Sequence, residues 1–93
     1  MTEKDVIAQS PRMVFREEGD GAFLFDPDTG NLKFVNAMGV RIYRMCSGGV
    51  SVGEIVSSLV TDYPRIPEGQ VREDVTSFLE EMTKMELLLI GES

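Results

Sequence analysis

The spacing of hydrophobic residues changes once along the chain, at Asn36, and this change limits the chain to folds that place strands before helices. Before Asn36, short apolar runs alternate with turn sequences. After it, apolar residues recur every three or four positions, the spacing of one face of a helix. Strands and helices that are separated along a chain are typical of α+β domains. The 93 residues have room for one such domain.

Three strands are predicted before Asn36, at residues 12–17, 22–25 and 32–35. The first two are joined by Glu-Gly-Asp-Gly, in which glycine accepts a positive φ at little cost. The second and third are joined by Asp-Pro-Asp-Thr-Gly, in which proline favours a type I turn and the glycine can take a left-handed conformation. Tight turns between consecutive strands predict an antiparallel meander.

Three helices are predicted after Asn36, which can cap the first of them, at residues 37–46. The clearest local signal is the S-x-x-E capping box of Ser51 and Glu54, which predicts a helix that ends before the Pro-Arg-Ile-Pro sequence. A third helix is expected from about Glu68 to Met85. A three-stranded sheet followed by three helices is the architecture of a winged helix-turn-helix with its wing at the front.

The two ends of the chain carry weaker signals. Residues 1–10 have no hydrophobic period and are predicted to be a flexible lead to a single domain at residues 11–93. They lack the apolar run of a secretory signal, and no stretch approaches the roughly 20 apolar residues of a membrane span. Residues 87–90 form a short apolar tail, which is either one more strand or a packed extension.

The composition excludes several classes of function. Histidine is absent, so the commonest general base and metal ligand are missing, and the lone thiol of Cys46 has no second thiol to pair with. We therefore expect no catalytic residues, no metal site and no cofactor. A net charge of −7 argues against binding to nucleic acid or to an anionic membrane surface. A cytoplasmic location is expected, because a single cysteine gives no disulfide framework.

The third strand is the best candidate for function. The last strand of a meander can lie at an edge of the sheet, where its backbone groups are free to pair with a strand from a partner. Leu32 and Phe34 would then point to one side of the sheet, and Lys33 and Val35 to the other. The pattern alone leaves open the alternative that a helix or tail of the same chain covers this edge.

Residues 26–88 resemble the PqqD-like family, the pyrroloquinoline-quinone (PQQ) synthesis protein D family, whose fold is also called the RiPP precursor peptide recognition element. No single motif carries the resemblance, which rests on the joint order and spacing of the matches. The matching positions are Asp26, Thr29 and Gly30; Phe34, Val35 and Asn36; Gly39, Ile42 and Tyr43; Gly48 and Gly49; Ser51, Val52, Glu54, Ile55 and Leu59; and Asp74, Val75, Phe78 and Leu79.

The resemblance implies a non-catalytic peptide chaperone of PQQ or related peptide biosynthesis. Such a domain binds the leader of a ribosomally made precursor peptide by strand addition and presents it to a modifying enzyme, often a radical SAM protein. The backbone of residues 32–35 would pair with the leader, and a groove along the last helix would receive its side chains. The residues implied for that groove are Arg72, Val75, Thr76 and Leu79. The simpler reading is that Val75 and Leu79 are core residues and that Arg72 is only solvated.

Two departures and two other hypotheses remain open. Glu86 stands where the family often has a glycine that caps the last helix, and Tyr43 stands where many members have a bulkier aromatic residue.

A winged-helix DNA-binding regulator is one alternative, although residues 68–85 carry five acids and two bases, a balance that repels phosphate. A purely structural subunit of a larger enzyme is the other. An open edge strand also permits a homodimer by strand exchange, so monomer and dimer stay open.

Overall fold

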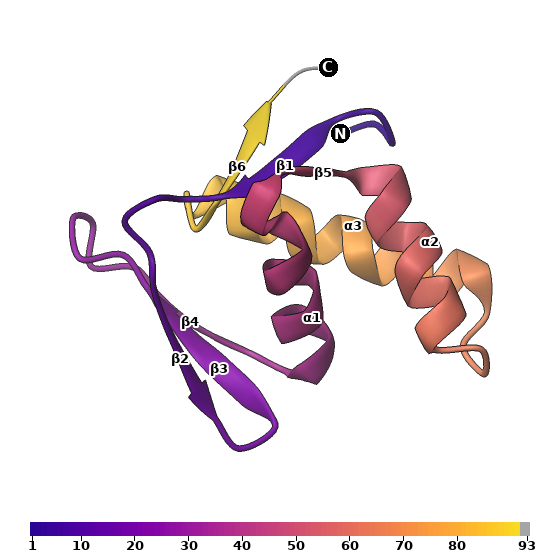
Figure 1. The fold of residues 1–93 in the computed structure, drawn as a ribbon, viewed down its shortest axis with the longest axis horizontal. Helices are drawn as coiled ribbons and strands as arrows, with labels where there is room; N and C mark the ends of the chain where they lie inside the picture. Colours follow the sequence, from indigo (N-terminus) through magenta and orange to yellow (C-terminus); the bar gives the residue numbers. More distant parts are fainter. Residues whose placement is uncertain (92–93) are drawn as a thin grey trace.

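The computed structural model describes residues 1–91 and places two small sheets on either side of three helices (Figure 1). The first sheet is an antiparallel meander in the order β2-β3-β4, and it forms the wing at one end of the molecule. Its strands are β2 (Val14–Glu18), β3 (Gly21–Phe25) and β4 (Leu32–Val35). These are the three strands that the turn sequences predict, and Gly19 and Gly30 take positive φ in the two connecting turns.

The three helices also form where the sequence predicts them, so the predicted α+β class is confirmed. They are α1 (Ala37–Met45), α2 (Val52–Asp62) and α3 (Glu68–Lys84), and a short 3-10 helix, η1 (Cys46–Gly48), follows α1. Asn36 caps α1 by accepting a hydrogen bond from the backbone N–H of Gly39 at 2.9 Å. Ser51 caps α2 in the same way, accepting from the N–H of Glu54 at 3.2 Å. None of the helices in residues 1–91 is long and apolar enough to cross a membrane.

A second sheet, which the sequence pattern does not reveal, joins the two ends of the chain. Its order is β5-β1-β6, with β1 (Val6–Gln9) between β5 (Val50–Ser51) and β6 (Leu88–Gly91), and both pairs are antiparallel. The prediction of a flexible lead at residues 1–10 is therefore wrong for β1, whose Ile7 is fully buried. The apolar tail at residues 87–90 was predicted to be either one more strand or a packed extension. It forms the strand β6.

The hydrophobic core lies between the helices and the inner faces of both sheets. It is continuous from the wing, through all three helices, to the strands at the two ends of the chain. The largest fully buried side chains are Ile7, Leu24, Ile42, Ile55, Leu59, Leu79, Met82, Leu87, Leu88, Val71, Val75 and Cys46. This core holds β4 on one side of the molecule and fixes the rotation of α3 relative to it.

Helix α3 ends in a Schellman motif although the residue at its left-handed position is Glu86. The N–H of Leu87 donates to the carbonyl of Met82 at 2.9 Å, and the N–H of Glu86 donates to the carbonyl of Thr83 at 3.1 Å. Leu87 and Met82 are both fully buried, as the apolar contact of this motif requires. Glu86 takes a φ of 63°, a conformation that costs an L-residue about 1–2 kcal/mol and that glycine adopts freely.

Replacing Glu86 with glycine should therefore stabilise the fold. Relief of the left-handed conformation, less the greater entropy of glycine in the unfolded chain, should raise the free energy of unfolding by about 0.5–1 kcal/mol. For a chain of this size, the melting temperature should rise by about 3–6 °C. Glu80→Gly, on the exposed side of the same helix, is the control and should lower stability by about 1 kcal/mol. A lower melting temperature for Glu86→Gly would contradict this account of the helix end.

Candidate functional site

Strand β4 is an edge strand of the wing. Along an antiparallel strand, the backbone groups of successive residues point alternately toward the paired strand and away from it, so every second residue of β4 has free backbone groups. Its residues pair with β3 in the register Phe25 with Leu32 and Leu24 with Lys33. The N–H of Asp26 donates to the carbonyl of Asn31 at 2.9 Å, so the hydrogen-bonded pairs are those that include Asn31, Lys33 and Val35. The N–H and C=O groups of Leu32 and Phe34 therefore point away from β3.

No other segment among residues 1–91 covers this edge. No strand pairs with β4 on its free side, and no hydrogen bond to a side chain or a turn involves the backbone groups of Leu32 or Phe34. The two side chains lie on the outer face of the wing, where they are 57% and 51% exposed. Of the two alternatives left open by the sequence, the structure therefore contains the open edge.

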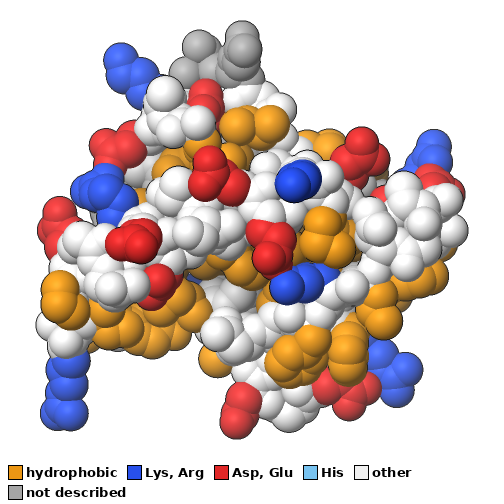
Figure 2. All heavy atoms as spheres, turned by 180° about the vertical axis from the view of Figure 1, so that it is seen from behind, with side chains coloured by type: hydrophobic (Ala, Val, Ile, Leu, Met, Phe, Trp, Pro, Cys, Tyr) orange, Lys and Arg blue, Asp and Glu red, His pale blue; other side chains and the backbone are white. Residues whose placement is uncertain are grey.

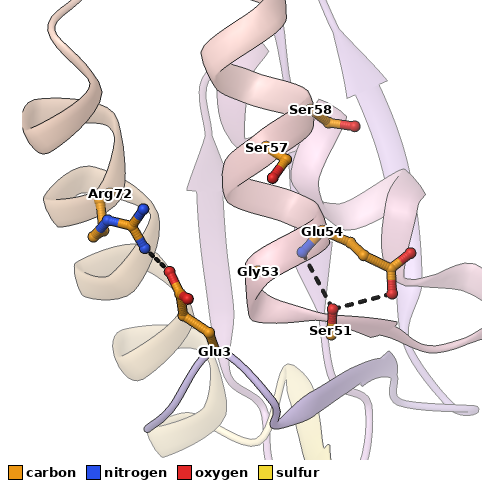
Figure 3. A pocket seen from close by; sticks show the side chains of 7 residues that line it. All are labelled: Glu3, Ser51, Gly53, Glu54, Ser57, Ser58 and Arg72. Atoms are coloured by element: carbon orange, nitrogen blue, oxygen red, sulfur yellow. Dashed lines mark hydrogen bonds and ion pairs between the residues drawn. The ribbon is translucent and has the colours of Figure 1, made fainter.

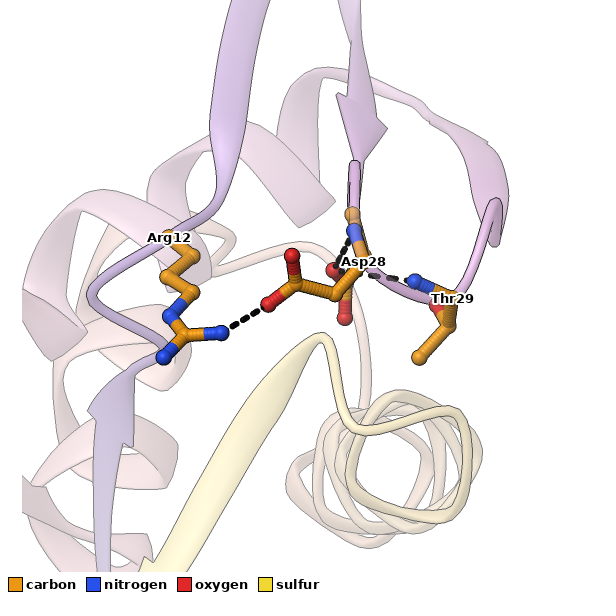
Figure 4. Close-up of polar contacts among 4 residues, drawn as sticks. Arg12, Asp28 and Thr29 are labelled. Atoms are coloured by element: carbon orange, nitrogen blue, oxygen red, sulfur yellow. Dashed lines mark hydrogen bonds and ion pairs between the residues drawn. The ribbon is translucent and has the colours of Figure 1, made fainter.

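The turn before β4 holds the edge strand in place (Figure 4). The buried carboxylate of Asp26 accepts hydrogen bonds from the backbone N–H groups of Asp28, at 2.9 Å, and Thr29, at 3.4 Å. Asp28 forms an ion pair with Arg12, which ties the turn to the segment before β2. This arrangement makes the two aspartates a structural turn and sets the position at which β4 begins.

Helix α3 lies along the inner side of β4. The side-chain amide of Asn31 donates to the carbonyl of Met85 at 2.8 Å, and Lys33 forms an ion pair with Glu81 at 2.6 Å. Farther along β4, Val35 and Phe78 both border Gly39 of α1. A Cβ atom added to this glycine would lie 2.8 Å from the Cβ of Val35 and 3.1 Å from the ring of Phe78. These contacts place the flank of α3 that carries Phe78 and Glu81 beside the edge strand.

An apolar hollow lies at the far end of β4. Phe34 lines it together with Met38 on α1 and Tyr63 at the end of α2, and Asp20, Asn36 and Ala37 complete its wall. An extended chain paired with β4 would have this hollow at one end of its path. The sequence does not predict this hollow, because helical spacing indicates which side chains are buried but not that Met38 and Tyr63 meet at the end of a strand.

Arg72 lies on the flank of α3 that faces Glu3 (Figure 3). It forms ion pairs with Glu3 and with Glu68, the latter at 3.5 Å, and it lines a polar pocket with residues of α2 that include Ser57. Arg72 and Glu81 are nine residues apart, about two and a half turns, so they point to opposite flanks of the helix. The structure therefore does not bring Arg72 to the edge strand that the sequence analysis placed beside it.

The other three helix residues implied for the groove are either buried in the core or on the same flank as Arg72. Val75 and Leu79 have no exposed surface, so their side chains are available only to the core. Thr76, one turn after Arg72, follows the same flank toward α2. On the other flank of α3, Glu81 pairs with Lys33 of β4, and Phe78 lies near Val35. A helical repeat in the sequence identifies the buried face of a helix, but it does not show which flank faces which strand. The flank beside β4 is identified only by the contact of Glu81 with Lys33 in the structure.

Reactive groups are sparse in the described part of the chain. Cys46 is fully buried, and burial raises the pKa of its thiol to about 12, so it is protonated and unreactive at neutral pH. Between residues 1 and 91, no three Cys, Asp or Glu side chains are grouped as a metal site. Acidic side chains are scattered over the face seen in Figure 2 and do not converge on a cleft. The arrangement offers backbone pairing and an apolar hollow.

These features define a class of small α+β domains in which a three-stranded sheet with an open edge precedes three helices. Within this class, the chain belongs to the PqqD family: the family model described as coenzyme PQQ synthesis protein D matches residues 21–88. The match begins at β3 and includes β4 and all three helices. It confirms the resemblance that the order and spacing of the motifs indicate.

A solved structure of TbiB1 in complex with the TbiA(beta) leader peptide is similar to this chain. The two chains are 27% identical and superpose with a TM-score of 0.78, over 92% of this chain and 98% of the other. No curated protein matches the sequence. The similarity therefore covers more of the chain than residues 21–88, which the family model matches.

Proposed function

We propose that this chain binds the leader of a ribosomally made precursor peptide by strand addition at β4. The open edge carries the proposal, because Leu32 and Phe34 present free donors and acceptors at the spacing of a strand ladder. Membership of the PqqD family supports it. So does the similarity to TbiB1, a protein whose structure contains a leader peptide.

The bound leader would lie between three features of this surface. Its backbone would pair with Leu32 and Phe34, and its inward side chains would meet Phe78 and the ion pair of Lys33 with Glu81. An apolar side chain at one end would enter the hollow beside Met38 and Tyr63. The site therefore includes the four residues of β4 predicted from the sequence, at positions 32–35. On α3 it includes Phe78 and Glu81 in place of the four predicted residues, Arg72, Val75, Thr76 and Leu79.

The proposal includes no catalysis by this chain and assigns the chemistry to a peptide-modifying enzyme, of which a radical SAM protein is one type. The unreactive thiol and the absence of histidine from the sequence support this division of labour. A cytoplasmic location and the absence of bound metal or cofactor stay predictions from the sequence.

The experiment is a calorimetric titration of the chain with the leader of a precursor peptide that is first identified among the neighbouring genes. The expected dissociation constant is micromolar or lower, on the order of −8 kcal/mol in binding free energy. Arg72→Ala should bind the leader within about twofold of the parent, because Arg72 lies on the flank of α3 opposite to the site. An affinity weaker than millimolar for the parent would contradict the function, and a tenfold loss in Arg72→Ala would contradict the placement of the site.

A further inference from the structure

The outer face of the wing carries an exposed apolar patch that strand addition does not cover. Eight large hydrophobic side chains of residues 1–91 are exposed, and five of them lie on this one face. The five are Val14, Phe23, Phe25, Leu32 and Phe34, which we call the wing patch. In Figure 2, where the wing is at the lower right, hydrophobic side chains reach the surface between acidic and basic ones.

The strand register gathers the wing patch into one surface. Val14 pairs with Phe25, which pairs with Leu32, so these three side chains form a row across the sheet. Phe23 and Phe34 pair in the next row, with ring centroids 5.1 Å apart in an edge-to-face arrangement. The surface is hollowed where Val14, Phe25 and Leu32 meet Arg16 and Glu18, which form an ion pair at 3.0 Å. An apolar centre with charged residues at its rim is the usual composition of a protein interface.

The size of the wing patch argues against a second copy of this chain as its occupant. Three strands about 4.8 Å apart, each with about five residues at 3.4 Å, give a face of roughly 250 Å². Two such faces packed together would bury roughly 500 Å² in total. Stable interfaces begin at roughly 1,200 Å², so this face needs a partner that makes further contacts elsewhere.

A peptide added to β4 also leaves most of the wing patch exposed, including Val14, Phe23 and Phe25, which lie on β2 and β3. An added strand lies in the plane of the sheet, so it covers the edge and widens the outer face by about 4.8 Å. Alternate side chains of the peptide would then stand beside Leu32 and Phe34, on the same face. The complex of chain and peptide therefore presents a wider surface than the chain alone, with side chains of the leader beside the wing patch.

We propose that the wing patch, extended by the bound leader, is the docking surface for the enzyme that modifies the precursor peptide. This inference rests on the proposed function and names the partner of the same site. An enzyme that must engage the peptide and its carrier together finds both on this face, side by side. Because the leader supplies part of the surface, the enzyme binds the complex more tightly than the chain alone, and by linkage it raises the affinity of the leader by the same factor.

The test compares leader affinity with and without a peptide-modifying enzyme that is identified, like the precursor, among the neighbouring genes. Addition of this enzyme should raise the leader affinity of the parent by about tenfold or more. Val14→Lys should bind the leader alone like the parent, because β2 is two strands away from the free edge. The same variant, and Phe25→Lys on the intervening strand, should lose the enhancement and slow modification of the precursor by a similar factor.

Ile90→Lys is the matched control. Ile90 is 49% exposed and Val14 is 50% exposed, but Ile90 lies on β6 in the other sheet. It should keep the full enhancement, and melting curves should show all three variants folded. Parent-like enhancement in both Val14→Lys and Phe25→Lys would overturn the inference, as would a parent whose leader affinity does not respond to the enzyme. Failure of the leader to bind the parent alone would instead refute the proposed function.

Discussion

Phe34→Pro is expected to weaken leader binding by about a hundredfold while the chain stays folded. The N–H of Phe34 points to the free edge, so proline removes no hydrogen bond from the sheet, and edge strands tolerate proline at such positions. In the complex, the same change removes a donor and leaves a carbonyl of the leader without a partner. The two effects together cost about 2–3 kcal/mol, and 1.4 kcal/mol corresponds to a tenfold change. Calorimetric titration measures the loss.

Two further variants separate the backbone effect from the side-chain effect. Phe34→Ala removes the aromatic ring but keeps the N–H, and it should therefore bind the leader more tightly than Phe34→Pro. Lys33→Pro removes an N–H on the side of the strand that pairs with Leu24 of β3, so it should lower the stability of the fold by about 3 kcal/mol. Equal affinities for Phe34→Pro and Phe34→Ala would show that the leader does not use this backbone group.

Leu79→Ala is expected to lower the free energy of unfolding by about 3 kcal/mol. Leu79 is fully buried among residues of α3 and the surrounding core, and a leucine-to-alanine change there leaves a cavity. A loss of this size is a large part of the 5–15 kcal/mol that stabilises a typical domain. Chemical denaturation measures it, and Thr76→Ala, on the flank of α3 that faces α2, should change stability by less than about 0.5 kcal/mol.

Leu79→Met tests whether Leu79 has a second role in binding. Methionine conserves most of the volume, so this variant should lose less than about 1.5 kcal/mol of stability and remain folded. If Leu79 belongs only to the core, the variant should bind the leader like the parent. A folded Leu79→Met protein that fails to bind would return Leu79 to the peptide groove, as the resemblance to the family first implied.

Local signals in the sequence are sufficient to predict the wing and the three helices. Each of these elements is bounded by a turn or a cap whose chemistry involves residues a few positions apart, such as Asp26 with Thr29 or Ser51 with Glu54. The sheet of β5, β1 and β6 has no such signal. Its strands are two to four residues long, and β1 pairs with β6 from the other end of the chain, so only the tertiary fold brings them together.

The candidate site also has one part that local sequence signals indicate and one part that depends on the tertiary fold. The edge position of residues 32–35 follows from the order of the strands, but the pattern left open whether a helix or tail of the same chain covers that edge. The wall of the site depends on the rotation of α3, which core packing fixes through residues such as Val71 and Met82. Each flank of this helix carries a charged residue that could contact a peptide, Arg72 on one and Glu81 on the other. The ion pair of Glu81 with Lys33 decides between them.

Amide hydrogen exchange of the chain with and without the leader peptide tests the central claim most directly. In the free chain, the amides of Leu32 and Phe34 point to solvent and should exchange rapidly, whereas those of Lys33 and Val35 pair with β3 and should exchange slowly. A saturating leader should slow exchange at Leu32 and Phe34 by about a hundredfold and leave the amides around Arg72 unchanged. Strand addition at β4 would be contradicted by a bound leader that leaves Leu32 and Phe34 as fast as in the free chain, with new protection only in α2 or the loop after Cys46.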